Sequence, residues 1–320
     1  MKHIINQLIN VWGGVKALAA ESNRTAFGLF AEFCYCFIRY GCLPRQYFNG
    51  GFWNKRANDR KDILTYRKFV RVMNTLNKRE YIHILENKAH FNEFFSDFIH
   101  RDWILSSESS PKQIADFIRK FGKVIVKPFD AMEGHGIYKL DVNKIDNIEY
   151  EAAKLASQQV MIEEILAQHP AMVFGNTSVN TIRVHTILDK QGKGHVLSCV
   201  LRAGVGDTVV DNYCSGGAIY PVDVQVGIVT GKGKSHNGGE HIVHPSTDIV
   251  MLGYRIPNWD IIIKETIKAA ERLPNLRLVG WDVAITQNGI ALIEGNHNPD
   301  YELYEFIGGG KSYPAIKRYI

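Results

Sequence analysis

The sequence predicts an α+β protein in which a helical front end precedes a region of short strands. In residues 1 to about 100, apolar side chains recur every three or four positions, which is the spacing of amphipathic helices. From Val124 the chain changes to short β-branched runs that glycines interrupt, a pattern typical of strands joined by turns. Helices followed by strands favour the α+β class. At 320 residues and 45% hydrophobic content, the chain can form two or three subdomains with large cores.

Several stretches have the apolar spacing or the boundary signals of helices. Four lie in the first hundred residues: 4–18, 27–38, 63–76 and 91–99. Two more interrupt the strand-rich part: residues 111–121, which follow the helix-start sequence Ser109-Ser110-Pro111, and residues 261–273, which end at Pro274. The stretch 26–38 is too short to span a bilayer and contains Glu32. We interpret it as a buried or partner-facing helix.

Short strands bounded by turn residues are expected in the remainder of the chain. Five are predicted at 124–127, 137–140, 160–162, 182–188 and 195–201. Residues 280–286 and the run that begins at Ile290 flank Gln287-Asn288-Gly289, and this arrangement predicts a hairpin.

The predicted hairpin carries two carboxylates and an amide. If Gln287-Asn288-Gly289 is a three-residue loop with Gly289 left-handed as a bulge, Asp282 lies opposite Glu294. Asn296 then shares their face, since side chains alternate along a strand. Such a set of oxygens suits Mg²⁺, although an ordinary hairpin with a solvated polar face fits this segment equally well. The opposite face is apolar: Trp281, Val283, Ala291 and Ile293.

A second candidate site starts at Lys127, where a strand leads into a loop that contains Gly134 and Gly136. Backbone N–H groups of such a loop can bind phosphate, and Lys127 would add a positive charge; the alternative is a hairpin with a flexible tip. The loop is not a Walker A motif. The two Gly-Lys-Ser runs, 233–235 and 310–312, lack the glycine that this motif requires five positions earlier, so we interpret both as mobile loops.

Charged side chains stand at or inside other predicted strands. Glu163 and Glu164 end the strand at 160–162, where a strand edge can meet adenine and a carboxylate can meet ribose; a solvated strand end is the simpler alternative. Arg183 lies within one strand, and Arg202 ends the next. An arginine on a half-buried strand must meet an anion, either a protein carboxylate or a ligand phosphate.

The net charge of +5 is modest and argues against a nucleic-acid-binding protein. A local excess occurs in residues 55–71, where seven Lys and Arg accompany two Asp. We interpret it as a solvated helix face, with an anionic substrate or a membrane surface as alternatives. Five cysteines without CxxC spacing, and no secretory apolar run near the N-terminus, lead us to expect a cytoplasmic protein. A glycine-rich loop holds three histidines whose spacing matches no familiar zinc site, and we interpret it as a substrate-covering loop: His236, His241 and His244.

Taken in order, these motifs resemble the ATP-grasp superfamily over roughly residues 85–305. The stretch from Arg183 to Asn296 is similar to the glutamate-adding ligases that modify a ribosomal protein. The whole chain most resembles the sugar-transfer-associated ATP-grasp proteins, which are usually found beside polysaccharide biosynthesis functions. The motifs that carry the resemblance are Asn87-Lys88, Lys127-Pro128 with the glycine loop, Glu163-Glu164, Asn180-Thr181-Ile182-Arg183, Asp211-Asn212 with Gly216-Gly217, and Asp282, Glu294 and Asn296.

The resemblance implies an ATP-grasp fold, in which two α+β subdomains grip ATP. We expect a helical N-terminal region at 1–85, one subdomain with the glycine-rich loop and the adenine hinge at 86–168, and a second with the magnesium site at 169–320. The implied activity is that of an ATP- and Mg²⁺-dependent carboxylate–amine ligase that acts through an acylphosphate, in cell-surface glycan or related biosynthesis. A kinase for a small molecule is one alternative. The other is a nucleotide-binding partner of a glycosyltransferase complex, with peripheral membrane association.

The resemblance also implies roles for individual residues. The implied ATP contacts are Lys88, Lys127, Glu133, Gly134, His135, Gly136, Glu163, Glu164, Leu166 and His169. The implied magnesium ligands are Asp282, Glu294 and Asn296, and the catalytic arginines are Arg183 and Arg202. The substrate side would include Asp211, Asn212, Gly216, Gly217 and Asn298. We expect Asp282→Asn or Glu294→Gln to abolish ATP turnover with the fold intact.

Two features depart from the superfamily pattern. Residues 1–85 are helical in pattern, whereas the superfamily usually has a Rossmann-like unit there that helps to bind substrate. Asp300 stands where many relatives have glycine. The identity of the substrate therefore does not follow from the resemblance.

Overall fold

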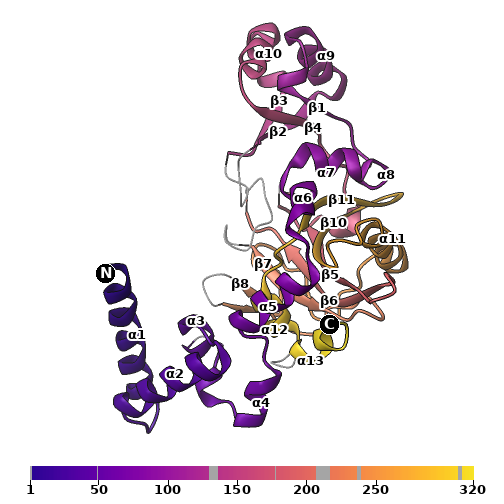
Figure 1. Ribbon diagram of the computed structural model, residues 1–320. Helices are drawn as coiled ribbons and strands as arrows, with labels where there is room; N and C mark the ends of the chain where they lie inside the picture. Colours follow the sequence, from indigo (N-terminus) through magenta and orange to yellow (C-terminus); the bar gives the residue numbers. More distant parts are fainter. Residues whose placement is uncertain are drawn as a thin grey trace. The chain divides into compact units, whose positions relative to one another are not determined.

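The computed structural model describes residues 2–48, 50–129, 136–176, 178–206, 217–235, 239–308 and 312–320. The chain divides into two compact units. Unit 1 comprises Met1–Leu76 and Asp300–Ile320, and unit 2 comprises Asn77–Pro299. The predicted α+β class is confirmed, with a helical N-terminal region ahead of the sheets (Figure 1).

All regular secondary structure in the described residues of unit 1 is helical. Its elements are α1 (Lys2–Glu21), α2 (Ala26–Tyr40), α3 (Pro44–Phe48), η1 (Phe52–Asn54), α4 (Ala57–Asp62), α5 (Tyr66–Leu76), α12 (Tyr301–Gly308) and α13 (Ser312–Lys317). Asp300 caps α12, because its Oδ1 accepts a 2.8 Å hydrogen bond from the Glu302 amide. Glu305 of α12 accepts a 2.6 Å bond from the Leu64 amide, which ties the C-terminal helices to the N-terminal ones.

Helix α2 has well-defined ends. Thr25 Oγ1 accepts a hydrogen bond from the Gly28 amide at the start, and Gly41 ends the helix with a φ of +70°. A side chain at Gly41 would collide with Arg67, since a Cβ there would lie 2.2 Å from the Arg67 Cβ. One face of α2 is buried in the core of unit 1: Leu29, Phe33, Cys36 and Tyr40. In the described part of the chain, no helix has the length and apolar composition that a membrane crossing requires.

The basic stretch 55–71 contains α4 and the first part of α5, and some of its basic side chains stabilise unit 1. Arg60 is buried and pairs with Glu32 at 2.5 Å. Lys68 Nζ donates to the carbonyl oxygens of Lys61 and Ile63, and burial lowers the pKa of Lys68 to about 8. The side chains of Lys55, Arg56, Lys61 and Arg71 are exposed, as expected for a solvated face.

Unit 2 begins with short helical segments and contains two antiparallel sheets. The helical segments are η2 (Arg79–Tyr81), α6 (His83–Glu86), α7 (Lys88–Phe94), α8 (Ser96–Ile99), η3 (Ser106–Glu108), α9 (Pro111–Phe121), η4 (Val142–Lys144), α10 (Ile148–Ala156), η5 (Pro170–Met172) and α11 (Trp259–Glu271). The strands are β1 (Trp103–Leu105), β2 (Lys123–Pro128), β3 (Tyr138–Asp141), β4 (Val160–Glu164), β5 (Thr181–Leu188), β6 (Gly194–Ala203), β7 (Ala218–Val222), β8 (Gly233–Ser235), β9 (Glu240–His241), β10 (Leu278–Thr286) and β11 (Gly289–Asn296).

The smaller sheet has the strand order β1-β4-β2-β3. Helices α9 and α10 cover it, with Ile114, Ile118 and Leu155 packed on Val124 and Val126 (Figure 1). The predicted helix 111–121 is confirmed at both ends. Ser110 forms a capping box with Gln113, Pro111 starts the helix and Gly122 follows it.

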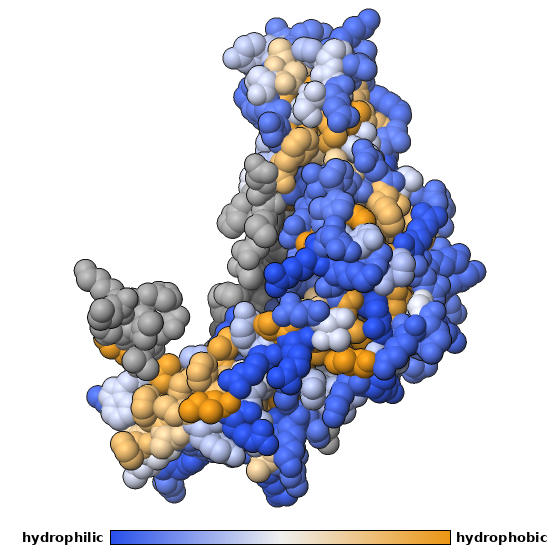
Figure 2. Space-filling view, in the orientation of Figure 1, coloured by the Kyte–Doolittle hydropathy of each residue, from blue (hydrophilic) through white to orange (hydrophobic). Residues whose placement is uncertain are grey.

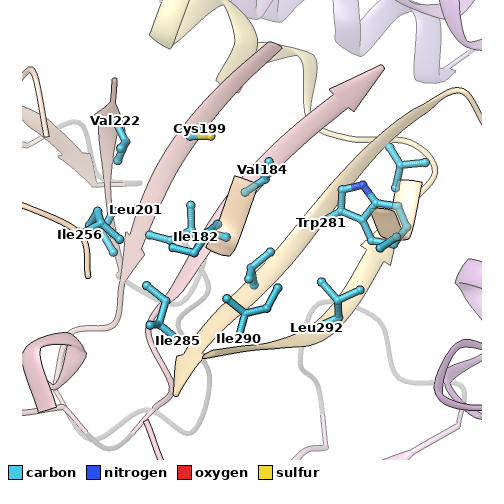
Figure 3. Packing of buried hydrophobic residues seen from close by; sticks show 14 of the residues in the cluster. Ile182, Val184, Cys199, Leu201, Val222, Ile256, Trp281, Ile285, Ile290 and Leu292 are labelled. Carbon is cyan, nitrogen blue, oxygen red and sulfur yellow. The ribbon is translucent and has the colours of Figure 1, made fainter. Parts of the chain in front are cut away.

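The larger sheet has the order β11-β10-β5-β6-β7-β8-β9. Its core lies on one face, where apolar side chains from five strands meet (Figure 3). These are Ile182, Val184, Cys199, Leu201, Val222, Trp281, Ile285, Ile290 and Leu292. Helix α11 and the helices α6 to α8 contribute to the same cluster through Ile262, Leu85, Phe91 and Phe95. This packing leaves the opposite face of β5, β6, β10 and β11 for polar side chains.

The interpretation of Gly233-Lys234-Ser235 as a mobile loop is wrong, because these residues form strand β8 and pair with β7. A glycine is needed there, since a Cβ at Gly233 would lie 2.3 Å from the Tyr220 ring. Of the other Gly-Lys-Ser run, Gly310 and Lys311 lie outside the described residues, and Ser312 starts α13.

Candidate active site

The hairpin of β10 and β11 places Asp282 opposite Glu294, as predicted. The predicted turn is wrong, however. Thr286 pairs with Gly289 across a two-residue loop, and Gly289 has a φ of +152° instead of the left-handed helical value of about +57°. The extra residue is Ile293, because Asp282 pairs with Glu294 while Val283 pairs with Leu292. The bulge therefore lies beside the carboxylates and restores the register that the shorter loop would have shifted.

The bulge also changes which side chains share the polar face. Ala291 and Ile293 were expected beside Trp281 and Val283, but they form a separate small cluster with Ala284 and Leu166. Ala284 is two positions from Asp282 and so lies on the same face of β10. This second apolar layer borders the acidic pair on the side toward the hairpin loop.

Asp282 is the centre of a buried charge cluster. Asp282 is 3% exposed, and arginines donate hydrogen bonds to both of its carboxylate oxygens. Arg183 of β5 donates through Nε to Oδ1 and through Nη2 to Oδ2, the latter at 2.9 Å. Arg202 of β6 donates to Oδ2 through Nη1. The expected partner of these arginines was either a protein carboxylate or a ligand phosphate, and the structure shows a protein carboxylate. This carboxylate is Asp282, which was also expected to bind the metal ion.

The ionisation of this cluster follows from its partners. Burial would raise the pKa of Asp282, but Arg183 and Arg202 hold it well below its ordinary range. The pKa of Glu294 is raised, by desolvation and by the facing Asp282 carboxylate. Because 53% of the Glu294 side chain is exposed, we attribute that rise mainly to the neighbouring negative charge. Arg183 Nη2 lies 3.8 Å from Glu294 Oε1 and offsets part of the repulsion.

The donor set fits a magnesium ion. Asn296 lies beside Glu294 and donates from Nδ2 to its Oε1 at 3.1 Å, so an amide oxygen and two carboxylates occupy one face. Desolvation and the facing Asp282 carboxylate raise the pKa of Glu294, and a cation bound between the two carboxylates would reduce their repulsion. No cluster of three or more His, Cys, Asp or Glu suited to a metal occurs among the described residues. Mg²⁺ commonly binds one or two protein carboxylates and completes its coordination with water and phosphate.

Gly280 and His185 support the arginine side of the cluster. A Cβ at Gly280 would lie 2.9 Å from the Pro299 Cβ and 3.3 Å from the Arg183 Cδ. His185 is buried next to Arg183 on β5, and its Nδ1 is 2.8 Å from Ser198 Oγ. Burial and the Arg183 charge lower the pKa of His185 to about 3, so it is neutral near pH 7.

A second charge cluster surrounds Glu163 in the smaller sheet. Its carboxylate is 2% exposed and is bound by Lys127 and by Arg101, whose Nε lies 3.1 Å from Oε2. Burial would raise the pKa of Glu163, but these two cations lower it to about 2. The carboxylate is thus directed at protein cations, and Asn92 completes the cluster with a 3.3 Å bond to Oε1.

The sequence reasoning missed Arg101 and Asn92. Arg101 is buried, and its Nη1 donates to the carbonyl oxygens of Ile99 at 3.2 Å and of Leu292 at 2.7 Å. It therefore joins β4 of the smaller sheet to β11 of the larger sheet. No motif marks it, and the only available signal was an arginine next to a strongly apolar segment.

Lys88 reaches the end of β2, directly after Lys127 in the chain. Lys88 starts α7, and its Nζ donates to the carbonyl oxygens of Pro128 and Phe129, each at 3.3 Å. Gly136, with a φ of +72°, lies against the same point, since a Cβ there would be 3.0 Å from the Pro128 Cγ. Three loop residues expected to contact ATP lie outside the described residues: Glu133, Gly134 and His135.

The segment after β4 runs back along the β10–β11 hairpin. Glu164 Oε2 accepts a 3.1 Å bond from the Asp102 amide. Leu166 packs on Ala284 and Ala291, and the His169 amide donates to the Ile285 carbonyl at 2.7 Å. Of the predicted hinge residues, the structure thus brings Leu166 and His169 next to the strand that carries Asp282.

The residues assigned to the substrate side are described only in part. Asp211, Asn212 and Gly216 lie outside the described residues, whereas Gly217 is buried before β7 and Asn298 is exposed after β11.

The histidines of the glycine-rich loop are likewise described in part. His236 lies outside the described residues, while His241 Nε2 is 3.2 Å from Ser235 Oγ. His244 Nε2 is 3.1 Å from the Gly204 carbonyl oxygen, and burial lowers the pKa of His244. These two side chains therefore have separate partners.

Comparisons with known proteins place the chain in a family. Residues 68–312 match the family described as sugar-transfer associated ATP-grasp. None of the curated proteins compared with the chain matches it.

Solved structures with similar backbones are distant in sequence. One is the ATP-grasp ligase PsnB complexed with precursor peptide PsnA2 and AMPPNP, with 14% identity, a TM-score of 0.47 and coverage of 76% of this chain and 61% of that chain. Another is the ADP complex of N5-carboxyaminoimidazole ribonucleotide synthetase, with 13% identity, a TM-score of 0.43 and coverage of 74% and 52%. A third is D-alanyl-alanine synthetase A from Vibrio cholerae, with 16% identity, a TM-score of 0.40 and coverage of 73% and 60%.

The chain thus spans less than two thirds of the length of each of these proteins. The family match extends over well more than half of the chain and includes both sheets. The chain belongs to the sugar-transfer-associated ATP-grasp family.

Proposed function

We propose that this protein is an ATP- and Mg²⁺-dependent carboxylate–amine ligase that acts through an acylphosphate. The observation that carries the proposal is the polar face of the larger sheet. There Arg183, Arg202, Asp282, Glu294 and Asn296 converge in a chain of the ATP-grasp family. Two guanidinium groups beside hard oxygen donors are suited to the charge that develops in phosphoryl transfer.

The nucleotide would lie between the two sheets of unit 2. We propose that the smaller sheet belongs to a subdomain at 86–168 and the larger sheet to a subdomain at 169–320, although residues 300–320 pack in unit 1. Lys88 and Lys127 would contact phosphate oxygens near Pro128, at the end of β2. Gly136 also approaches Pro128 closely. Glu163 would act mainly by orienting Lys127, since its carboxylate is buried against that lysine. Glu164, Leu166 and His169 would line the adenine and ribose side, with Glu133, Gly134 and His135 in the covering loop.

Asp282, Glu294 and Asn296 would hold Mg²⁺. When bound, this ion would supply positive charge that stabilises the phosphate oxygens during phosphoryl transfer. The half-exposed Glu294 is the accessible member of the set, and Asp282 is held in its ionised form by the arginines.

Arg183 and Arg202 would serve the two chemical steps. A substrate carboxylate oxygen attacks the γ-phosphorus, the bond to the β–γ bridging oxygen breaks, and ADP leaves with an acylphosphate formed. An amine then attacks the acyl carbon, phosphate leaves with the former carboxylate oxygen, and the nitrogen loses a proton to give the amide. Both steps concentrate negative charge on phosphate oxygens, which the guanidinium groups of Arg183 and Arg202 would stabilise.

The substrates we propose are a small carboxylate and a small amine, such as a sugar acid and an amino acid, in cell-surface glycan or related biosynthesis. This context derives from the family alone. Asp211, Asn212, Gly216, Gly217 and Asn298 would lie on the substrate side. We propose no nucleic-acid partner.

Glu294→Gln is the sharpest test, because this carboxylate is half exposed and its loss strands no buried cation. ADP release should fall to background across a panel of sugar acids and amino acids with which the wild type is active, and mass spectrometry should find the amide with the wild type only. Glu108→Gln at an exposed position of η3 is the matched control and should retain activity. Near-wild-type turnover by Glu294→Gln would refute the metal assignment. A stable phosphorylated product from the wild type would identify a kinase instead.

A further inference from the structure

Helix α2 carries two apolar stripes, and only one of them is used by the fold. Leu29, Phe33, Cys36 and Tyr40 follow one another at helical spacing and are buried. Phe27, Ala31, Cys34 and Ile38 have the same spacing of four, three and four residues on the other side. Phe27 is 76% exposed and Ile38 is 71% exposed. This second stripe is hereafter the outer stripe; its half-buried Cys34 touches the core of unit 1, whereas its ends are exposed.

Further apolar side chains widen the outer stripe. Tyr35 and Phe37 flank it on α2 and are exposed. On α1, Trp12 packs edge-on against Phe30 with ring centroids 5.5 Å apart, and Ile9 is exposed. Figure 2 shows apolar side chains gathered over this part of unit 1. An exposed apolar surface of contiguous aromatic and aliphatic side chains is typical of a docking surface.

The charge of the same region identifies the occupant. Residues 1–76 contain 12 Lys and Arg against four Asp and Glu, whereas the whole chain has 38 against 33. Residues 77–320 therefore contain 26 Lys and Arg against 29 Asp and Glu, so the net positive charge of the protein comes from residues 1–76. Arg67 stands at one end of the outer stripe, where its Nη1 and Nη2 donate to the carbonyl oxygens of Ile38 and Phe37 at 2.7 and 2.8 Å. Arg39 is exposed beside it.

We propose that α2 and its basic surroundings bind the surface of an anionic lipid membrane, with the outer stripe inserted at the level of the headgroups. Aromatic and aliphatic side chains on one face of a helix, with Lys and Arg around it, are the features of helices that lie in the membrane interface. At 15 residues, α2 is too short to cross a bilayer. Lipid phosphates would face the exposed Lys55, Arg56, Lys61 and Arg71.

This inference does not depend on the proposed reaction. The decisive experiment is sedimentation of the full-length protein with vesicles of phosphatidylcholine alone and of phosphatidylcholine with 30% phosphatidylglycerol. We expect binding to the anionic vesicles, much weaker binding to the neutral ones, and a decrease with added salt.

Two variants test the two halves of the surface. Phe27→Ser with Ile38→Ser removes the exposed tips of the outer stripe and should weaken vesicle binding about tenfold or more. Lys55→Glu with Lys61→Glu should weaken it by a similar factor at low salt. Val226→Ser with Val250→Ser is the matched control, since both valines are exposed in unit 2, and it should bind like the wild type. All three should retain the wild-type melting temperature and ATP turnover without vesicles.

Other results would overturn the proposal. Equal binding to neutral and anionic vesicles would exclude recognition of anionic lipid. Wild-type binding by Phe27→Ser with Ile38→Ser would exclude the outer stripe as the membrane-binding surface. No vesicle binding, together with a dimer in solution that this variant converts to a monomer, would show that a second copy of the chain covers the stripe.

Discussion

Arg101 donates a 2.7 Å hydrogen bond from Nη1 to the carbonyl oxygen of Leu292, two residues before Glu294. The same guanidinium holds Glu163, which in turn holds Lys127. One buried side chain therefore connects the strand that carries the proposed magnesium ligands with the lysine proposed to contact phosphate.

Replacing Arg101 by methionine should destabilise unit 2 strongly. Glu163 would lose one of the two cations that bind it in a buried site, and such a loss costs about 3–5 kcal/mol. Urea unfolding at pH 7 measures the change. Arg119→Met, which removes two pairs between exposed side chains, with Asp116 and with Glu149, should cost about 1 kcal/mol or less. Equal effects of the two variants would contradict a structural function for Arg101.

Acid should remove the contribution of Glu163 in a defined pH window. Its pKa is about 2 in the folded protein and 4.5 ordinarily, so the unfolded chain takes up the proton first. The stabilisation is complete above about pH 4.5 and is lost as the pH falls toward 2, with a magnitude on the order of 3 kcal/mol. Urea unfolding at pH 5 and pH 3 should show a smaller decrease for Glu163→Gln than for the wild type. The same decrease in both would exclude Glu163 as a source.

Asp282→Asn and Glu294→Gln should differ in stability although both were expected to leave the fold intact. The asparagine would remove the buried carboxylate that both Arg183 and Arg202 bind, and the loss of one partner from a buried ion pair costs about 3–5 kcal/mol. The glutamine replaces a half-exposed carboxylate whose pKa is already raised, so its effect should stay within about 1 kcal/mol. Thermal unfolding of the two variants checks this. A stable Asp282→Asn protein would show that another group neutralises the arginines.

Gly280→Ala should disturb the arginine cluster by steric pressure. Its methyl group would lie within 3.3 Å of Pro299, His185 and Arg183, and overpacking of this kind costs about 1–3 kcal/mol. The matched control is Gly13→Ala in α1, where no atom lies within 4 Å and helix propensity favours alanine. Unfolding free energies should therefore fall for the first variant and stay level or rise for the second.

Local signals in the sequence predicted much of the fold. Ser110, Pro111 and Gly122 marked the ends of one helix, and alternation in residues 280–296 identified the hairpin. The opposition of Asp282 and Glu294 was predicted from the wrong turn, because a bulge at Ile293 compensated for a loop one residue shorter than expected. A three-residue loop without a bulge and a two-residue loop with a bulge at Ile293 place the same two carboxylates opposite each other. The position of the carboxylates in the sequence therefore does not distinguish the two arrangements.

The parts that the sequence could not predict depend on distant contacts. Arg101 meets Glu163 across 62 residues and Leu292 across 191 residues, and no spacing rule joins such positions. Arg183 had two acceptable anions on physical grounds, and only the three-dimensional register of β5 and β10 identified Asp282 as its partner. The outer stripe of α2 was also hidden, because a helix that is apolar on both sides gives no indication of which side the core covers.

The sharing of Asp282 by two arginines makes it an internal counter-ion. Among the described residues, the carboxylates of Asp282 and Glu294 face the guanidinium groups of Arg183 and Arg202. If phosphate took the place of Asp282 at the arginines and a divalent cation took the place of the arginines at Asp282, each of these charges would keep a partner of opposite sign. Under the proposed function, nucleotide binding would then exchange ion pairs without leaving a buried charge uncompensated.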